Sequence, residues 1–257
     1  MTSLATRPRA SKRVIILGAL SAIAVATARL YAADGARLML VGRGDIRLKD
    51  LAQDLLTRGA SLALTVDMDL EQGAKDAPRY LSTWREDLGG IDHVLLFYGA
   101  LGDDLRARED MAALQSLLSI NFTSAACWCA ASGSLLGSQN AGSLVAVSSV
   151  AGDRGRQSNF VYGAAKGGLA LFVQGLAHAL APTGARAVAL KPGFVDTPMT
   201  AHLPKSGPLW ASPEAIASAV RRAADHGGPI QYAPTIWRSI MLAIRLVPSG
   251  LFHKTKL

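Results

Sequence analysis

The chain has 257 residues, 50% of them hydrophobic and 18% charged, and it contains no long polar tract and no internal repeat. This composition is typical of a globular domain and excludes a disordered or fibrous protein. The formal net charge of +8 sits at the two ends, because residues 1–13 and 226–257 each carry four Lys or Arg and no acid. A neutral body with basic ends lacks the basic stripe of a nucleic-acid-binding protein, so we expect no nucleic-acid partner.

Apolar runs that end at a glycine or a polar residue alternate with segments of helical spacing along the chain. We expect strands at residues 14–17, 37–41, 61–66, 92–97, 143–148 and 185–190, and helices at residues 22–30, 48–58, 77–88, 108–131 and 162–180. This alternation predicts an α/β fold with a doubly wound parallel sheet, the Rossmann architecture, in a single domain over residues 13–257. Residues 1–12 form a basic N-terminal extension, and ligands should bind at the carboxyl ends of the strands.

The first apolar run imitates a signal peptide, because basic residues precede residues 14–20 and an alanine-rich stretch follows them. Cleavage near Ala28 would remove the first strand and its turn, so we expect the segment to be retained. No apolar run approaches the 18 or so residues that span a bilayer. We therefore expect a cytoplasmic protein, and peripheral contact with the inner membrane face stays open.

Neither the cysteines nor the histidines form a recognisable metal site. Cys127 and Cys129 are two residues apart on a predicted helix, so their side chains diverge, which disfavours a disulfide or a paired thiolate site. The histidines are scattered and have no ligand spacing. We expect no metal.

Four polar elements occur in order at strand ends and on predicted helices. They are Asn121 in the long helix, Ser149 after the fifth strand, Tyr162 with Lys166 in Tyr-Gly-Ala-Ala-Lys, and Pro192-Gly193 followed by Thr197. A lone Tyr-x-x-x-Lys is a weak signal, but the ordered set resembles the short-chain dehydrogenase/reductase family over about residues 13–222. The resemblance implies an oxidoreductase that transfers a hydride between a nicotinamide cofactor and a carbonyl or secondary alcohol, usually as a homodimer or homotetramer.

Hydride transfer to a ketone places negative charge on its oxygen, which requires a proton donor and a hydrogen-bond donor at that atom. Tyr162 fits the first role and Ser149 the second. Lys166 stands on the same helix face as Tyr162, and we expect its charge to lower the pKa of the tyrosine. The resemblance further implies that Lys166 holds the nicotinamide ribose and that Asn121 anchors a water in a proton relay. Alone, Asn121 would be interpreted as an ordinary helix asparagine.

The expected phosphate turn departs from the family pattern. The family's Thr-Gly-x-x-x-Gly-x-Gly reads here Leu17-Gly18-Ala19-Leu20-Ser21-Ala22-Ile23-Ala24, so only the first glycine remains. Each alanine adds a methyl group and restricts the backbone, whereas Ser21 still offers a hydroxyl to a phosphate. We expect cofactor contacts from Gly18, Ser21, Ala22 and Ile23.

Arg43 follows the second strand, where an arginine favours the 2′-phosphate of NADP and an acid would favour NAD. A solvated loop arginine is the alternative interpretation. We predict NADP, with NAD less favoured. The resemblance adds further cofactor contacts, which are Asp67 and Met68 at the adenine, Thr197 at the nicotinamide carboxamide, and Gly99, Pro192, Gly193 and Val195.

Residues 198–208 are rich in Pro, Gly and Lys without a regular period, which predicts a substrate lid or a plain surface loop. Residues 148–152, 159–163, 201–203 and 244–254 resemble the bacterial reductases of decaprenylphosphoryl-2-keto-erythro-pentose. Those enzymes reduce a keto group on a lipid-linked pentose. This narrower resemblance implies a small-molecule keto-sugar or a lipid-linked sugar as substrate.

The C-terminal segment 236–257 begins with an amphipathic pattern. We expect Ile236, Ile240, Ala243 and Ile244 to share one helix face, with Trp237 and Met241 beside it. One interpretation is packing against the domain or a partner subunit. The other is an interfacial helix that binds anionic lipid headgroups through its basic residues, which are Arg238, Arg245, Lys254 and Lys256.

A catalytically silent NADP-binding sensor or scaffold protein is the alternative function, because the glycine turn is degraded. The intact Ser149, Tyr162 and Lys166 favour the enzyme.

Overall fold

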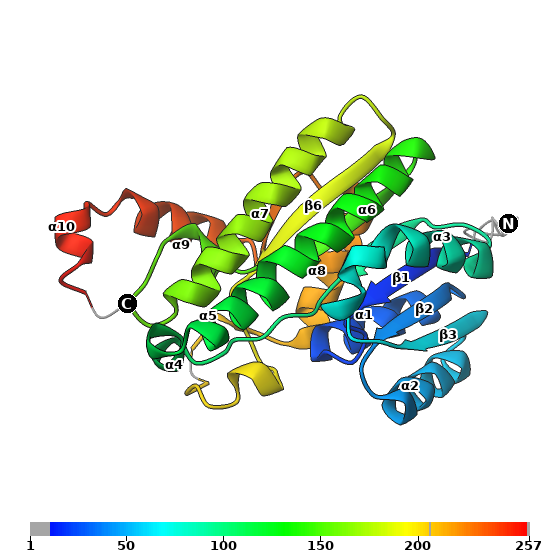
Figure 1. Ribbon diagram of the computed structural model, residues 1–257, viewed down its shortest axis with the longest axis horizontal. Coiled ribbons are helices and arrows are strands. Elements are labelled where there is room, and N and C mark those ends of the chain that lie inside the picture. The colour runs from blue at the N-terminus through cyan, green and yellow to red at the C-terminus, as the bar shows by residue number, and fades with distance from the viewer. Residues whose placement is uncertain (1–10, 206, 256–257) are drawn as a thin grey trace, which may run out of the picture.

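The computed structural model describes residues 11–205 and 207–255, without the side chains of residues 104 and 105. Its centre is a seven-stranded parallel sheet with the order β3-β2-β1-β4-β5-β6-β9 (Figure 1). The strands are β1 (Arg13–Leu17), β2 (Arg37–Gly42), β3 (Leu62–Asp67), β4 (His93–Leu96), β5 (Gly142–Val147), β6 (Ala185–Pro192) and β9 (Ile230–Ala233). The strand order reverses between β1 and β4, which opens a crevice at the carboxyl edge of the sheet. The predicted doubly wound Rossmann fold in a single domain is confirmed.

Helices cover both faces of the sheet. One face carries α1 (Ala22–Ala32), α2 (Asp45–Thr57) and α8 (Pro213–His226), and the other carries α3 (Ala77–Leu88), α6 (Ser124–Ser138) and α7 (Phe160–Leu180). Along β1, Val14 and Ile16 belong to the first apolar cluster, whereas Ile15 and Leu17 belong to the second. This alternation follows from the two-residue period of a strand, and it explains why both sides of the strand are apolar.

Helix α7 is, among the described residues, the one helix long and apolar enough to span a membrane. It packs on α6 and β6, and its buried residues Leu169, Ala170, Val173 and Leu180 belong to the second apolar cluster, which is the pattern of a core helix. On α6, Cys127 is exposed whereas Cys129 is buried, and both thiols are free.

The prediction of one long helix over residues 108–131 is wrong. The structure has α4 (Asp104–Glu109), α5 (Met111–Leu118), a π-helical turn (Ser119–Thr123) and then α6, which runs on to Ser138. Asp110 interrupts the run because its backbone is extended and its carboxylate accepts hydrogen bonds from the N–H groups of Ala112 and Ala113 at 2.9 and 3.1 Å. A side chain that caps a new helix in this way ends the previous one.

The sequence analysis does not predict α8, β9 or the small parallel pair of β7 (Phe194–Val195) and β8 (Trp210–Ala211). The two strands of that pair have 2 residues each and β9 has 4, which is too short for a periodic signal. The pairing joins residues 194–195 to residues 210–211 and so holds the segment after β6 in place.

The C-terminal arm consists of α9 (Ile236–Leu246) and α10 (Ser249–Phe252), and Figure 1 shows it reaching out from the body of the molecule. Trp237 and Met241 are buried together with Val150, and Ile240 and Ile244 pack against them. Of the four residues predicted to share one helix face, Ile240 and Ile244 pack inward, whereas Ile236 is 54% exposed and Ala243 is also exposed. The buried face is centred on Trp237 and Met241, so it lies further round the helix than the sequence pattern indicates. Lys256, one of the four basic residues of this segment, lies outside the described residues.

Candidate active site

A cavity of about 1230 Å³ opens at the carboxyl edge of the sheet. It is lined by most of the residues predicted from sequence, which are Ser21, Ala22, Ile23, Gly99, Ser149, Tyr162, Lys166, Pro192, Gly193, Val195 and Thr197. Gly18, Arg43, Asp67, Met68 and Asn121 are not among its lining residues. The fold therefore gathers side chains and backbone from five different strand ends around one space.

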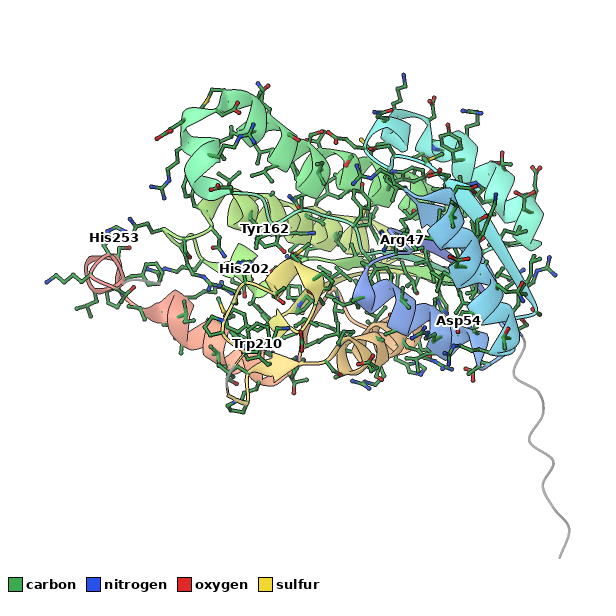
Figure 2. The ribbon with its side chains drawn as sticks, turned by 90° about the horizontal axis from the view of Figure 1, so that it is seen from below. Arg47, Asp54, Tyr162, His202, Trp210 and His253 are labelled. Carbon is green, nitrogen blue, oxygen red and sulfur yellow. The ribbon has the colours of Figure 1, made fainter. Side chains whose placement is uncertain are left out.

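Tyr162 and Lys166 lie one turn apart on α7, and both are buried, with exposed fractions of 9% and 4%. The Lys166 Nζ atom lies 6.0 Å from the centre of the Tyr162 ring and donates a hydrogen bond to the carbonyl of Val147 at 3.2 Å. That carbonyl ends β5, so the lysine ties the helix to the sheet beside Ser149. Tyr162, His202 of the lid region and Arg47 of α2 all line the cavity, and all three are labelled in Figure 2.

Ser149 follows β5 and caps the short 3-10 helix Val150–Asp153. Its Oγ atom accepts a hydrogen bond from the N–H of Ala151 at 3.1 Å, which fixes the hydroxyl at the mouth of the strand. The serine hydroxyl also hydrogen-bonds with the Tyr162 hydroxyl. Two hydroxyl groups thus meet at one point of the cavity, as the binding of a single carbonyl oxygen requires.

Burial shifts the pKa values of both α7 groups. Burial raises the pKa of Tyr162, and the hydrogen bond from Ser149 opposes the shift. Burial also lowers the pKa of Lys166 to about 8. The expectation that Lys166 lowers the pKa of Tyr162 is therefore not met, because the desolvation of the phenol is the larger effect. A protonated tyrosine beside a lysine that titrates near neutrality suits proton donation.

Asn121 is fully buried in the π-helical turn. Its Nδ2 donates to the carbonyls of Ala100 and Leu117 at 2.8 and 3.0 Å, and its Oδ1 accepts from the N–H of Ala100 at 3.1 Å. A Cβ atom on Gly99 would lie 2.7 Å from Asn121 Oδ1 and 3.0 Å from Lys166 Nζ. The asparagine, the glycine and the lysine therefore form one tightly packed unit, and a π turn at this place fits the tendency of such turns to mark functional sites.

The turn after β1 keeps the one glycine it needs. Gly18 has a φ of +84°, and a Cβ atom there would lie 2.7 Å from the backbone nitrogen of Tyr98. Ala22 and Ala24 lie instead within α1, where the helical backbone suits alanine. The replaced family glycines therefore introduce no backbone strain. Ser21 caps α1, because its Oγ accepts from the N–H of Ala24 at 3.2 Å, and its own hydroxyl proton stays available to a phosphate.

Two arginines follow β2. Arg43 is paired with Asp69 at 3.3 Å and its side chain is 79% exposed, whereas Arg47 on α2 lines the cavity. Asp67 accepts a hydrogen bond from the N–H of Gly44 at 2.9 Å, which shapes the turn between the two arginines. The N–H of Met68 donates to the carbonyl of Gly42 at 2.7 Å. Asp67 and Met68 therefore support the loop that carries Arg43, and the sequence analysis missed Arg47.

The segment after β6 lines the opposite end of the cavity. The Thr197 N–H donates to Thr200 Oγ1 at 3.2 Å, and Thr200 Oγ1 donates to the Val195 carbonyl at 2.6 Å, so the start of the predicted lid is internally bonded. Trp237 of α9 reaches this segment, because a Cβ atom on Gly193 would lie 1.8 Å from Trp237 Nε1. The C-terminal arm thus contributes directly to the site, and only the fold of the complete chain reveals this.

The model of the short chain dehydrogenase family matches residues 12–207. The chain belongs to this family. It is 36% identical over 241 residues to an uncharacterized oxidoreductase of Mycobacterium tuberculosis, which covers 94% of this chain and 96% of the relative. It is 34% identical to an uncharacterized oxidoreductase of Streptomyces coelicolor over 95% of both chains. It is also 30% identical to carbonyl reductase family member 4 of Xenopus laevis, over 82% of this chain and 89% of the relative. Among solved structures, levodione reductase is 24% identical, with a TM-score of 0.76 over 86% of this chain and 95% of that chain.

As a short-chain dehydrogenase, the chain is an oxidoreductase that uses a nicotinamide cofactor. The residues present fit such a cofactor. The positive φ of Gly18 and its close approach to Tyr98 form a turn at the start of α1, where N–H groups and the helix dipole favour a pyrophosphate. Gly99 leaves its side of the cavity open, because any side chain there would collide with Asn121 and Lys166.

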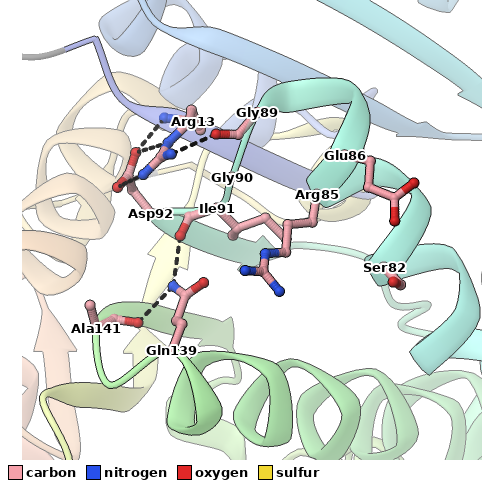
Figure 3. A pocket seen from close by; sticks show the side chains of 10 residues that line it. All are labelled: Arg13, Ser82, Arg85, Glu86, Gly89, Gly90, Ile91, Asp92, Gln139 and Ala141. Carbon is pink, nitrogen blue, oxygen red and sulfur yellow. Dashed lines mark hydrogen bonds and ion pairs between the residues drawn. The ribbon is translucent and has the colours of Figure 1, made fainter.

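A second cavity, of about 560 Å³, lies at the amino edge of the sheet (Figure 3). Its Arg13 donates hydrogen bonds to both carboxylate oxygens of Asp92, at 2.9 and 2.8 Å, and to the carbonyl of Gly89 at 2.7 Å. These bonds raise the pKa of Arg13 and, with the charge of the arginine, lower the pKa of Asp92. Arg13, Asp92 and the carbonyl of Gly89 satisfy one another here, which is typical of a structural contact.

Proposed function

We propose that this short-chain dehydrogenase is an NADPH-dependent reductase of a carbonyl group on a sugar or a lipid-linked sugar. The observation that carries the proposal is the convergence of the Ser149 hydroxyl, the Tyr162 hydroxyl and the Lys166 ammonium in one buried cavity. A catalytically silent sensor or scaffold has no need for a tyrosine and a lysine held in desolvated positions beside a serine hydroxyl.

The cofactor, when bound, supplies the hydride. The Tyr162 hydroxyl donates a proton to the carbonyl oxygen as negative charge develops there, and the Ser149 hydroxyl donates a hydrogen bond to the same oxygen. The Lys166 ammonium stabilises the phenolate that is left. Asn121 holds the backbone of Ala100 from both sides and so keeps the floor of the site rigid.

The choice of NADP over NAD rests on Arg43 and Arg47. Both follow β2, and only Asp69 pairs with either of them among the described residues. A guanidinium binds a 2′-phosphate through charge-assisted hydrogen bonds of about 1.5–3 kcal/mol, or roughly 10- to 100-fold in affinity. The family alone fixes a nicotinamide cofactor, and these two arginines favour the phosphorylated form.

Cofactor titration, followed by NADPH and NADH fluorescence, tests this choice. We expect Arg47→Asp and Arg43→Asp each to weaken NADPH binding by about tenfold or more and to change NADH binding by less than about threefold. Equal losses for both cofactors would show that neither arginine binds the phosphate. A parallel screen with keto-sugars distinguishes the reductase from the sensor, because a sensor binds NADPH and consumes none.

We further propose a cytoplasmic homodimer or homotetramer that touches an anionic membrane through the C-terminal arm. The outer face of the arm exposes Leu242, Leu246 and Leu251, at 56%, 73% and 60%, and no acid follows Asp225. Exposed leucines beside Arg238 and Arg245 fit an interfacial helix, in which each basic residue contributes about 1 kcal/mol near an anionic surface.

Removing the whole arm would open the core, because Trp237 and Met241 are buried. Co-sedimentation with anionic vesicles at low salt is therefore compared for the full chain and for the double variant Leu242→Ser, Leu246→Ser. Reduced binding of the variant, with the oligomeric state unchanged, supports membrane contact. A variant that instead dissociates into monomers assigns this face to a subunit interface.

A further inference from the structure

Three buried polar atoms without a hydrogen-bond partner among the described residues belong to side chains that line the active-site cavity. They are Arg156 Nε, Asn159 Oδ1 and Trp237 Nε1. A buried donor or acceptor without a partner costs about 1–3 kcal/mol, so such atoms are rare in folded proteins. Their gathering in one cavity indicates that a ligand completes their hydrogen bonds.

Arg156 is the charged member of this group. It precedes α7 and is partly buried, and burial lowers its pKa. The nearby carboxylate of Asp153 does not neutralise it, because Asp153 accepts hydrogen bonds from Lys191 Nζ at 2.5 Å and from the Tyr232 hydroxyl at 2.6 Å. No ion pair or side-chain hydrogen bond joins Arg156 to any other residue that the structure describes.

Arg154, two residues before Arg156 in the same loop, has a structural role. Arg154 Nη1 donates to the carbonyls of Ile244, Arg245 and Val247 at 3.1, 2.8 and 2.8 Å, and its guanidinium stacks 4.2 Å from the centre of the Phe252 ring. It therefore fastens the C-terminal arm. Arg156 makes no such contact, although it lies only two residues further on.

The surroundings of Arg156 are also positively charged. Arg108 and Lys166 line the same cavity, and Arg108 donates to the carbonyl of Gln157 at 2.9 Å. Asp103 is the single acid among the lining residues that the structure describes. A cavity with this balance attracts an anion and repels a cationic substrate.

We propose that Arg156 binds an oxyanion of the substrate, a phosphate or a carboxylate, and that Asn159 binds a hydroxyl group beside it. This inference rests on the proposed function, which makes the cavity a carbonyl-reducing site. The planar guanidinium matches the two oxygens of such a group, and the Asn159 oxygen accepts the hydrogen bond that a hydroxyl donates. The substrate class is therefore an anionic hydroxy-ketone.

Direct binding tests the anion site without any turnover. Inorganic phosphate is titrated calorimetrically into protein saturated with its preferred oxidised cofactor, so that the cofactor's own phosphate sites are filled. We expect Arg156→Gln to weaken phosphate binding at least tenfold, Arg156→Lys to weaken it less, and the control Arg58→Gln, which lies outside the cavity lining, to leave it unchanged. Equal phosphate affinity of the parent and Arg156→Gln would overturn the proposal. Acetate in place of phosphate shows whether the site prefers a carboxylate.

A matched set of ketones then tests the substrate class. Dihydroxyacetone is neutral, dihydroxyacetone phosphate adds a phosphate, and hydroxypyruvate carries a carboxylate. We expect kcat/KM to favour an anionic member, and Arg156→Gln to reduce that preference at least tenfold while kcat for the neutral ketone stays within about threefold. Preference for the neutral ketone in both proteins would contradict the proposal. Arg156-dependent phosphate binding without reduction of any ketone would instead refute the reductase and leave the anion site standing.

Discussion

The two edges of the sheet each hold a cavity lined by arginine, but the arginines differ in their partners. At the amino edge, Arg13 is bound on both sides by Asp92 and Gly89, and its pKa is raised. At the carboxyl edge, Arg156 has no partner among the described residues, and burial lowers its pKa. Arg13 belongs to a closed set of hydrogen bonds, whereas Arg156 presents an open donor.

The same contrast extends to the other polar groups of the carboxyl edge. Tyr162 and Lys166 are buried, and desolvation shifts the pKa of each towards its neutral form. The burial of ionisable groups lowers stability, so such groups persist where they serve binding or chemistry. The hydrogen bonds of Arg13 and Arg156, rather than the presence of a cavity or a charge, separate the structural arginine from the one open to a ligand.

We expect the largest difference between the two edges in the kcat values of two glycine variants, Gly99→Ala and Gly89→Ala. Gly99→Ala would press its methyl group against Asn121 Oδ1 and Lys166 Nζ, whereas Gly89 has a φ of +70° and open space around it. A displacement of about 1 Å in a catalytic group costs roughly 10²-fold in rate. We expect Gly99→Ala to lower kcat about 10²-fold, and Gly89→Ala to cost about 1 kcal/mol of stability with kcat unchanged. Steady-state kinetics measures kcat and thermal melts measure stability. A similar kcat for the two variants would contradict the distinction between the carboxyl and amino edges.

The pH dependence of reduction should follow Lys166. Its folded pKa is lowered to about 8, so the ammonium loses its proton as the pH rises through about 8. Reduction needs this charge beside the Tyr162 phenolate, so kcat/KM should fall about tenfold per pH unit above that value. Arg stays protonated in this range, so Lys166→Arg should have lower activity but no such decline. A profile of Lys166→Arg that declines at the same pH as the parent would assign the titration to another group.

The ion pair of the amino edge should act on stability alone. The folded pKa of Asp92 is lowered below its ordinary value of 3.8, so the pair stabilises the fold above that pH and loses its effect as the pH falls further. Because both side chains are partly exposed, we expect Arg13→Ala to lower the free energy of unfolding by only about 1 kcal/mol at pH 7, and by less at pH 3. Urea denaturation at the two pH values measures this. The more exposed pair of Arg58 with Asp54, whose side chains are 46% and 31% exposed, supplies the control, and Arg58→Ala should have the smaller effect.

The sequence predicts what depends on short spacings. Tyr162 and Lys166 lie one turn apart on a helix with a clear period, and Ser149 directly follows an apolar strand. The π turn around Asn121 is not predictable in this way, because it depends on hydrogen bonds to Ala100, which lies 21 residues away. Local patterns therefore identify the catalytic residues but not the turn that orients one of them.

The residues that the sequence missed have a similar explanation. Arg47 lines the cavity because the left-handed Gly44 turns the chain into α2, whereas sequence position alone favours Arg43. Trp237 reaches Gly193 only after β9 has joined the sheet and α9 has folded back on Val150. Such contacts join distant parts of the chain, and no local period records them.

The most direct test of the central claim is NADPH consumption by Tyr162→Phe, with Tyr80→Phe as the control. Tyr80 lies on α3, where it stacks on Trp84 of the same helix and packs against the second apolar cluster. Both variants therefore lose one hydroxyl, but only Tyr162 lines the cavity. The assay uses a ketone that the parent reduces. We expect Tyr162→Phe to lower turnover about 10²-fold or more and to leave the Kd of NADPH within about twofold. We expect Tyr80→Phe to change neither quantity. Turnover by Tyr162→Phe within a factor of two of the parent would contradict the assignment of Tyr162 as the proton donor.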